Sequence, residues 1–307
     1  MEYNKPSLSI TDQIQKLKIR GLVVDDENYA KHWLEHVSYY RLSAYYIPFE
    51  ILDPSSARTH QFKRDSFFSD IIALYIFDRK LRLLTIEALE RIEISIRSHW
   101  VNELTQKYGS HAHITHEPFK CPWTHLNDLT RASIPLKEQN KETFLEHYRK
   151  KYTQPFLPPL WITAETLSLG ALSHWIKNTK DIHIKKQIAQ AVGLPTAELL
   201  EETLHCLTPI RNVCAHHGRL WNKKFPMQVP SIKKISHSLI PNNCPDRTSH
   251  NLYNFLTVTA HMLKYINHNS SWHSRLKYLL KNLSIQNISL TSMGFPPDWD
   301  SRPVWQD

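Results

Sequence analysis

Apolar residues recur at spacings of three and four along most of this chain, and runs that alternate between polar and apolar residues are few. A spacing of three and four places apolar side chains on one face of an α-helix, whereas a half-buried strand alternates. The chain contains only six glycines, so few residues that disfavour helix interrupt the pattern. We therefore predict an all-α fold.

The most regular segment covers residues 69–108, which include neither glycine nor proline. A helix of this length would extend roughly 60 Å at about 1.5 Å per residue, long enough to form the spine of a domain. Its apolar positions form one stripe, which consists of Leu74, Phe77, Leu81, Leu84, Ala88, Ile92 and Ile96.

The same segment carries opposite charges four residues apart, a spacing that brings two side chains together on a helix. The pairs are Asp78 with Arg82, Glu87 with Arg91, and Glu93 with Arg97. Two roles remain open. Either the pairs stabilise a solvated helix surface, or Glu93 or Arg97 faces another helix and orients a functional side chain there, which requires a buried pair.

Capping residues indicate where the preceding helices begin. Ser9 or Thr11 suits the N-cap of a first helix that ends before Gly21. Asp26 suits the N-cap of a second helix that runs towards Tyr40. We therefore predict that the N-terminal segment of the chain is helical as well.

Three side chains capable of RNA chemistry lie within six residues, at Arg211, Asn212 and His216. A guanidinium can hold a phosphate at two points, and an imidazole can transfer protons near neutral pH. A helix is expected from about residue 196 to residue 207, and Thr208 followed by Pro209 indicates a short separate helix that carries the three residues. The alternative is that Arg211 and His216 are surface residues without a catalytic role that fall five residues apart by chance.

On a helix, Asn212 and His216 share one face, but Arg211 lies about 140° from His216. The Arg211 and His216 side chains of a single copy therefore do not converge on one phosphate. Either the helix is distorted near Pro209, or two copies meet across a symmetric interface and line a shared cleft; we favour the second.

Cations and one aromatic residue follow the motif closely, and we expect them to contact RNA. Lysine and arginine side chains can hold the phosphate backbone, while an indole ring can stack on a base. The expected RNA-binding residues are His217, Arg219, Trp221, Lys223 and Lys224.

The composition is compatible with a nucleic-acid partner. The chain has 307 residues, and its 38 Lys and Arg against 29 Asp and Glu give a formal net charge of +9, which favours polyanions. Its four cysteines form no C-x-x-C pair, and no run of apolar residues is long enough to span a membrane. We expect a cytoplasmic protein with no disulfide framework and no membrane partner.

Three histidines lie close together at His111, His113 and His116, a spacing that raises the question of a metal site. No carboxylate or cysteine stands at a convincing ligand spacing beside them. We expect neither a metal nor a cofactor.

Five segments resemble the Abi-like abortive-infection proteins of the HEPN superfamily and occur in the same order along the chain as in that family. Together they cover essentially the whole chain. RNVCAHHGRLWN, from Arg211, resembles the R-x4-6-H motif of that superfamily. The other segments are KPSLSITDQIQKLKIRGLVVDD, SYYRLSAYYIPF at residues 38–49, FDRKLRLLTIEALERIEISIR at residues 77–97, and MGFPPDWDSRPVW near the end.

The resemblance implies a HEPN-like helical bundle with additional N- and C-terminal helices. It implies one all-helical domain over residues 1–307, with an N-terminal part at 1–65, a core with the motif at 66–225, and a C-terminal part with a packed tail at 226–307. Arg211 and His216 match the motif, and Asn212 matches the polar residue that commonly follows the arginine. His217 satisfies a longer version of the motif, and we prefer His216.

The function that the resemblance implies is a metal-independent endoribonuclease that acts as a homodimeric toxin in bacterial anti-phage defence. An antitoxin, either RNA or protein, would keep such a toxin silent. The alternative is a non-catalytic RNA-binding protein held in a complex with a structured partner RNA. A third reading gives Arg211 a structural role at a dimer interface.

Overall fold

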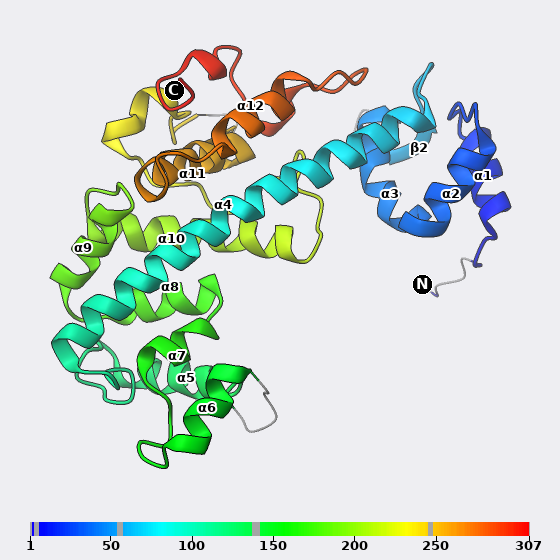
Figure 1. Ribbon diagram of the computed structural model, residues 1–307. Helices are drawn as coiled ribbons and strands as arrows, with labels where there is room; N and C mark the ends of the chain where they lie inside the picture. The colour runs from blue at the N-terminus through cyan, green and yellow to red at the C-terminus, as the bar shows by residue number, and fades with distance from the viewer. Residues whose placement is uncertain (1, 3–5, 54–57, 137–141, 245–247, 307) are drawn as a thin grey trace. The chain divides into compact units, whose positions relative to one another are not determined.

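The computed structural model describes residues 2, 6–53, 58–136, 142–244 and 248–306 (Figure 1). The chain divides into two compact units. Unit 1 comprises Met1–Arg82 and Leu276–Ser292, and unit 2 comprises Leu83–Arg275 and Met293–Asp307. Nearly all regular structure in the described ranges is helical, so the predicted all-α class is confirmed.

Unit 1 contains three short helices, a two-stranded hairpin and the first part of a long helix. Ser9 and Asp26 are N-caps whose side chains accept hydrogen bonds from backbone N–H groups three residues further on, as predicted. Ser38 has a φ of 71°, which ends the second helix before Tyr40. The elements are α1 (Ile10–Ile19), α2 (Glu27–Val37), α3 (Tyr39–Tyr46), β1 (Glu50–Leu52) and β2 (Arg58–Phe62).

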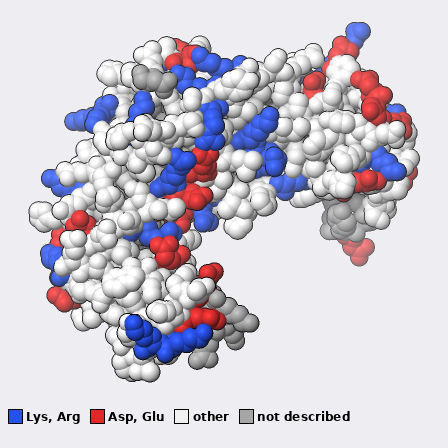
Figure 2. Space-filling view, in the orientation of Figure 1, with Lys and Arg blue, Asp and Glu red and all other residues white. Residues whose placement is uncertain are grey.

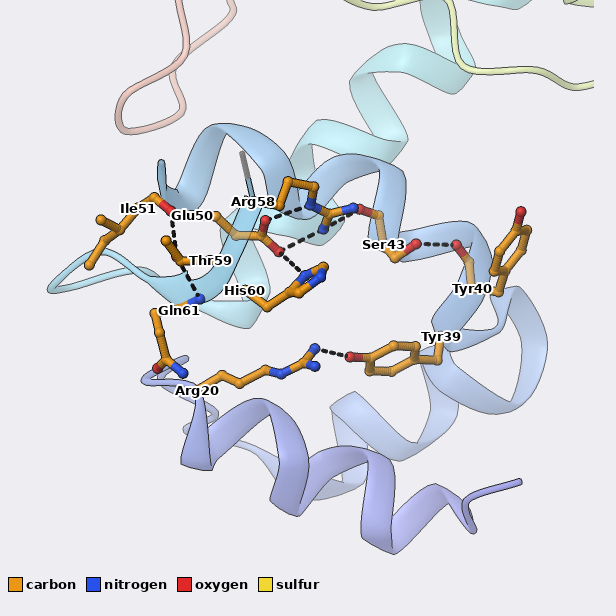
Figure 3. Close-up of polar contacts among 10 residues, drawn as sticks. All are labelled: Arg20, Tyr39, Tyr40, Ser43, Glu50, Ile51, Arg58, Thr59, His60 and Gln61. Carbon is orange, nitrogen blue, oxygen red and sulfur yellow. Dashed lines mark hydrogen bonds and ion pairs between the residues drawn. The ribbon is translucent and has the colours of Figure 1, made fainter. Parts of the chain in front are cut away.

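The hairpin carries a buried carboxylate that the sequence did not reveal (Figure 3). Glu50 is 1% exposed and accepts two hydrogen bonds from the Arg58 guanidinium, of 2.7 and 2.6 Å. His60 Nδ1 lies 3.6 Å from the same carboxylate. Only Phe62 is buried in the second strand, so the strand lacks the polar and apolar alternation that predicts one.

The long helix α4 (Phe68–Tyr108) confirms the predicted helix to within one residue at its start. Six of the seven stripe positions are buried, and Leu84 is half-buried. All three predicted charge pairs form. One of the boundaries between the two units falls inside this helix, between Arg82 and Leu83.

Unit 2 contains the second part of α4 together with further helices, and it buries most of its large aromatic side chains. Trp100, Trp175 and Trp272 have 2% or less of their surface exposed, and Trp100 Nε1 donates to Thr179 Oγ1 at 3.1 Å. The tail is buried as well, with Trp305 at 0% exposed. The helices are α5 (Pro122–Ser133), α6 (Thr143–Lys151), α7 (Leu160–Glu165), α8 (Leu169–Asn178), α9 (Ile182–Ala191), α10 (Ala197–Ala215), α11 (Leu252–Ile266) and the start of α12 (Trp272–Lys281).

The helix that carries the motif differs from the prediction of two separate segments. Thr196 is the N-cap of α10, and the helix runs on through Pro209 to Ala215. Thr208 is not a cap, because its hydroxyl donates to the Leu204 carbonyl at 2.8 Å. Pro209 removes one backbone donor, but Leu207 and Ile210 on either side of it are buried, so packing holds the helix together.

Along the described part of the chain, no helix is both long enough and apolar enough to cross a membrane.

Candidate functional site

The end of α10 determines where the motif residues lie. Asn212 is in the last turn, and its carbonyl accepts a hydrogen bond from the backbone N–H of His216, which is the C-cap. His217 then has a φ of 57°, and its N–H bonds to the Cys214 carbonyl at 3.2 Å, while the next N–H, of Gly218, bonds to the Val213 carbonyl. These bonds form a Schellman motif, in which a residue with positive φ ends the helix. The chain therefore turns away immediately after His216.

Arg211 points from α10 towards α4, where it meets Glu93. Its Nε lies 3.4 Å from Glu93 Oε2, and Glu93 Oε1 accepts a hydrogen bond from Arg97 Nη2 at 2.7 Å. Arg97 also donates to the Leu167 carbonyl at 2.8 Å, and its Nη1 lies 3.8 Å from Glu165 Oε2. We call these four side chains, from Glu165 through Arg97 and Glu93 to Arg211, the Arg211 row.

The row answers the question that the charge pairs left open. Glu93 and Arg97 are each 8% exposed, so this pair is buried, and Glu93 is the member that contacts the motif helix. Each oxygen of Glu93 faces a different guanidinium, which restricts the position of Arg211. Glu165 and the Leu167 carbonyl were not expected from the sequence, because they precede α8 and nothing in their spacing connects them to Arg97.

The remaining motif residues face solvent. The Arg211 side chain is 28% exposed, whereas Asn212, His216 and His217 are exposed. An inward arginine and an outward histidine are the arrangement expected for residues about 140° apart on a helix. Within one chain, Arg211 is held in place and His216 is accessible to a ligand or to a second copy.

The predicted RNA-binding residues differ in accessibility. Lys224 is exposed, and Arg219 and Lys223 are half-buried. Trp221, which we expected to stack on a base, is 2% exposed, so its ring packs inside unit 2 and offers no face to RNA. Burial of so large an apolar ring stabilises the fold more than its exposure beside the motif would.

The three clustered histidines do not form a metal site in the described residues, where no group of three or more His, Cys, Asp or Glu is placed to hold an ion. His113 is fully buried, and its Nε2 lies 3.2 Å from Thr163 Oγ1. Burial, together with the neighbouring His111 and His125, lowers the pKa of His113 to about 3. It is a neutral core residue.

The face of the molecule drawn in Figure 2 shows charged side chains of both signs along α4. The acidic and basic side chains are interspersed there. Any attraction of a polyanion to this face must therefore come from particular residues rather than from a uniform basic surface.

Comparison with known proteins places the chain in a family. No curated protein and no solved structure gives a significant match. The model of the family described as Abi-like protein matches residues 32–222, which is more than half of the chain and includes both Glu93 and the motif. Membership of this family supports involvement in abortive infection. The chain belongs to the Abi-like protein family.

Proposed function

We propose that this protein is a metal-independent endoribonuclease of the HEPN type and acts as a toxin in abortive infection. The observation that carries the proposal is the position of Arg211, held at Glu93 while Asn212 and His216 of the same helix face solvent. These are the groups needed to stabilise a phosphate and to move protons at it.

In the proposed reaction, the ribose 2′-OH attacks the adjacent phosphorus, and the bond from phosphorus to the 5′ oxygen breaks. The products are a 2′,3′-cyclic phosphate and a free 5′-OH. His216 takes the proton from the 2′-OH or gives one to the leaving oxygen, and Arg211 stabilises the negative charge of the pentacoordinate phosphate. Asn212 orients His216 or the scissile group. DNA lacks the 2′-OH and is not a substrate.

Glu93 has a positioning role in this reaction. It contacts Arg211 through Nε, and in the proposed complex the two Nη groups of Arg211 bind two phosphate oxygens. Because Arg211 and His216 diverge within one chain, the complete site is built by two copies, with Arg211 and His216 of both lining one cleft.

The decisive experiment uses purified protein, total RNA and EDTA. Wild-type protein should produce RNA fragments with cyclic-phosphate ends, and His216→Ala should reduce the rate by about 10²–10⁴-fold, the usual contribution of a general acid or base. His205→Ala is the matched control, because His205 is an exposed histidine on the same helix. RNA binding without cleavage, unchanged by His216→Ala, would refute the nuclease and favour the non-catalytic RNA-binding alternative.

A mixing experiment tests the two-copy site. Arg211→Ala and His216→Ala proteins, each inactive alone, are combined under conditions that allow subunits to exchange. Half of the dimers are then mixed and each retains one complete pair, so about a quarter of the wild-type activity should return. No recovery, in a mixture shown to exchange subunits, would mean that each copy uses its own pair.

A further inference from the structure

Unit 2 contains a cavity of about 370 Å³ that the mechanism above does not use. It lies between the second half of α5, the turn before α8 and the first turns of α8, and we call it the α5–α8 cavity. Its polar lining includes Asp128, Arg131, Thr166, Ser168 and His174. This volume is in the range of small-ligand pockets, about 300–1,000 Å³.

The cavity adjoins the Arg211 row. Leu167 lines the cavity, and the backbone carbonyl of the same residue accepts the hydrogen bond from Arg97. Arg97 in turn bonds to Glu93, the partner of Arg211. A ligand in the cavity would therefore rest against a residue that is bonded directly to the row.

The carboxylate of Asp128 is the feature of the cavity that indicates a ligand site. The residue is only 7% exposed, and its buried Oδ2 has no hydrogen-bond partner. Buried polar atoms without a partner are costly, and a desolvated carboxylate more so, which is why such groups in native proteins mark functional sites. Burial raises the pKa of the Asp128 carboxyl, although His174, Arg131 and His125 act in the opposite direction.

The chemistry of an ionised carboxylate selects among ligands, because it can only accept hydrogen bonds. Guanine presents two adjacent donors on its Watson–Crick edge, N1–H and the N2 amino group, which match two carboxylate oxygens. Uracil places its single N–H between two carbonyls, and adenine and cytosine place an acceptor nitrogen beside their amino group. Those three bases each bring an acceptor against the carboxylate.

The rim of the cavity adds groups that suit a phosphate. Arg131 and His174 are exposed residues and line the cavity together with the buried Asp128. A guanidinium donates charge-assisted hydrogen bonds to phosphate oxygens, and an imidazole N–H can donate one as well. The cavity thus combines an acceptor for a base with donors for the phosphate attached to it.

We propose that the α5–α8 cavity binds a guanine nucleotide of the RNA substrate, with Asp128 as the residue that determines specificity for this base. This inference rests on the proposed ribonuclease function. It makes the enzyme a guanine-directed nuclease.

Direct binding tests the cavity without cleavage. Titration calorimetry compares the four ribonucleoside monophosphates with wild-type protein at about pH 8, about four units above the ordinary pKa of an aspartate. GMP should bind at least about tenfold more tightly than AMP, CMP or UMP, and Asp128→Asn should abolish this preference, because a bidentate contact to a base discriminates by about that factor or more. Asp25→Asn, at an exposed aspartate of unit 1, is the control. Equal affinity for all four nucleotides, or no binding by any of them, would overturn the proposal.

A second variant keeps the test decisive if Asp128→Asn does not fold. His174→Ala alters an exposed side chain and should weaken GMP severalfold while leaving guanosine, which lacks the phosphate, unchanged. An equal effect on both ligands, or none on either, contradicts the assigned phosphate contact.

Cleavage assays separate the failure of this inference from failure of the nuclease. Short RNAs that contain one guanine should be cleaved faster than matched RNAs without guanine, and Asp128→Asn should remove the difference. If cleavage depends on His216 but is equally fast with and without guanine, the assignment of the cavity is overturned and the nuclease proposal stands. GMP binding that depends on Asp128 without any cleavage would overturn the nuclease and leave the base site standing.

Discussion

Replacing Glu93 by glutamine tests how the Arg211 row is held together. The substitution keeps the shape of the side chain but removes the charge that lies between Arg97 and Arg211. The amide retains one acceptor and directs an N–H donor towards the other guanidinium. One of the two contacts therefore becomes a clash between donors.

The magnitude follows from the burial of the partners. Removing one member of a fully buried ion pair costs about 3–5 kcal/mol. Here Arg97 keeps its 2.8 Å hydrogen bond to the Leu167 carbonyl and has Glu165 at 3.8 Å, while Arg211 is 28% exposed and can regain water. We therefore expect a loss of about 2–3 kcal/mol in the free energy of unfolding of unit 2.

Urea unfolding followed by tryptophan fluorescence measures this loss. Trp33 is the only one of the nine tryptophans that lies in unit 1, so the signal reports chiefly on unit 2. At a slope of about 2–3 kcal/mol per M, the midpoint should fall by about 1 M urea.

Glu90→Gln is the matched control, because Glu90 is exposed on the same helix and its loss should change stability by less than about 0.5 kcal/mol. If Glu93→Gln unfolds at the same urea concentration as this control, the charge of Glu93 does not hold the row and the reasoning is wrong.

Three further predictions concern the fold. Gly193 has a φ of +80°, and an added Cβ would lie 2.5 Å from Tyr265 Cε2 and 2.9 Å from Cγ, so Gly193→Ala should destabilise unit 2 by about 2–4 kcal/mol in the same urea assay. Gly109→Ala, at a φ of +85° with no described atom within 4 Å of the new Cβ, should cost only about 1 kcal/mol, and equal losses would contradict the steric argument. His113 has a pKa of about 3 in the folded protein against 6.5 when unfolded, so protons bind the unfolded chain preferentially and stability should fall by about 1.6 kcal/mol from pH 6.5 to pH 5. His113→Gln should remove this part of the pH dependence, and an unchanged slope would show that another group causes it. Glu50→Gln should destabilise unit 1 by about 2 kcal/mol and speed hydrogen exchange of the amides of β1 and β2, whereas unchanged exchange there would mean that the buried carboxylate does not hold the two strands together.

The features that the sequence determined are local ones. The helix at residues 68–108 and its three charge pairs could be predicted, because spacings of three and four residues describe neighbours on one helix. The N-caps at Ser9 and Asp26 could be predicted for the same reason, since a cap bonds to an N–H group only three residues away.

Contacts between distant segments settled the rest. Pro209 marks a helix boundary when only its neighbours are considered, yet burial of Leu207 and Ile210 carries α10 through it. The lysines beside Trp221 in the sequence indicate a nucleotide contact, yet its ring is buried in the core.

The candidate sites show the same division. The motif at Arg211 and His216 is visible in the sequence, because its residues lie within six positions at the end of one helix. That Glu93 rather than Arg97 meets Arg211 depended on how α4 packs against α10, and the cavity at Asp128 depended on how α5 packs against α8. Local spacing predicts the face on which a side chain lies, whereas burial and ion pairing depend on which other face comes to cover it.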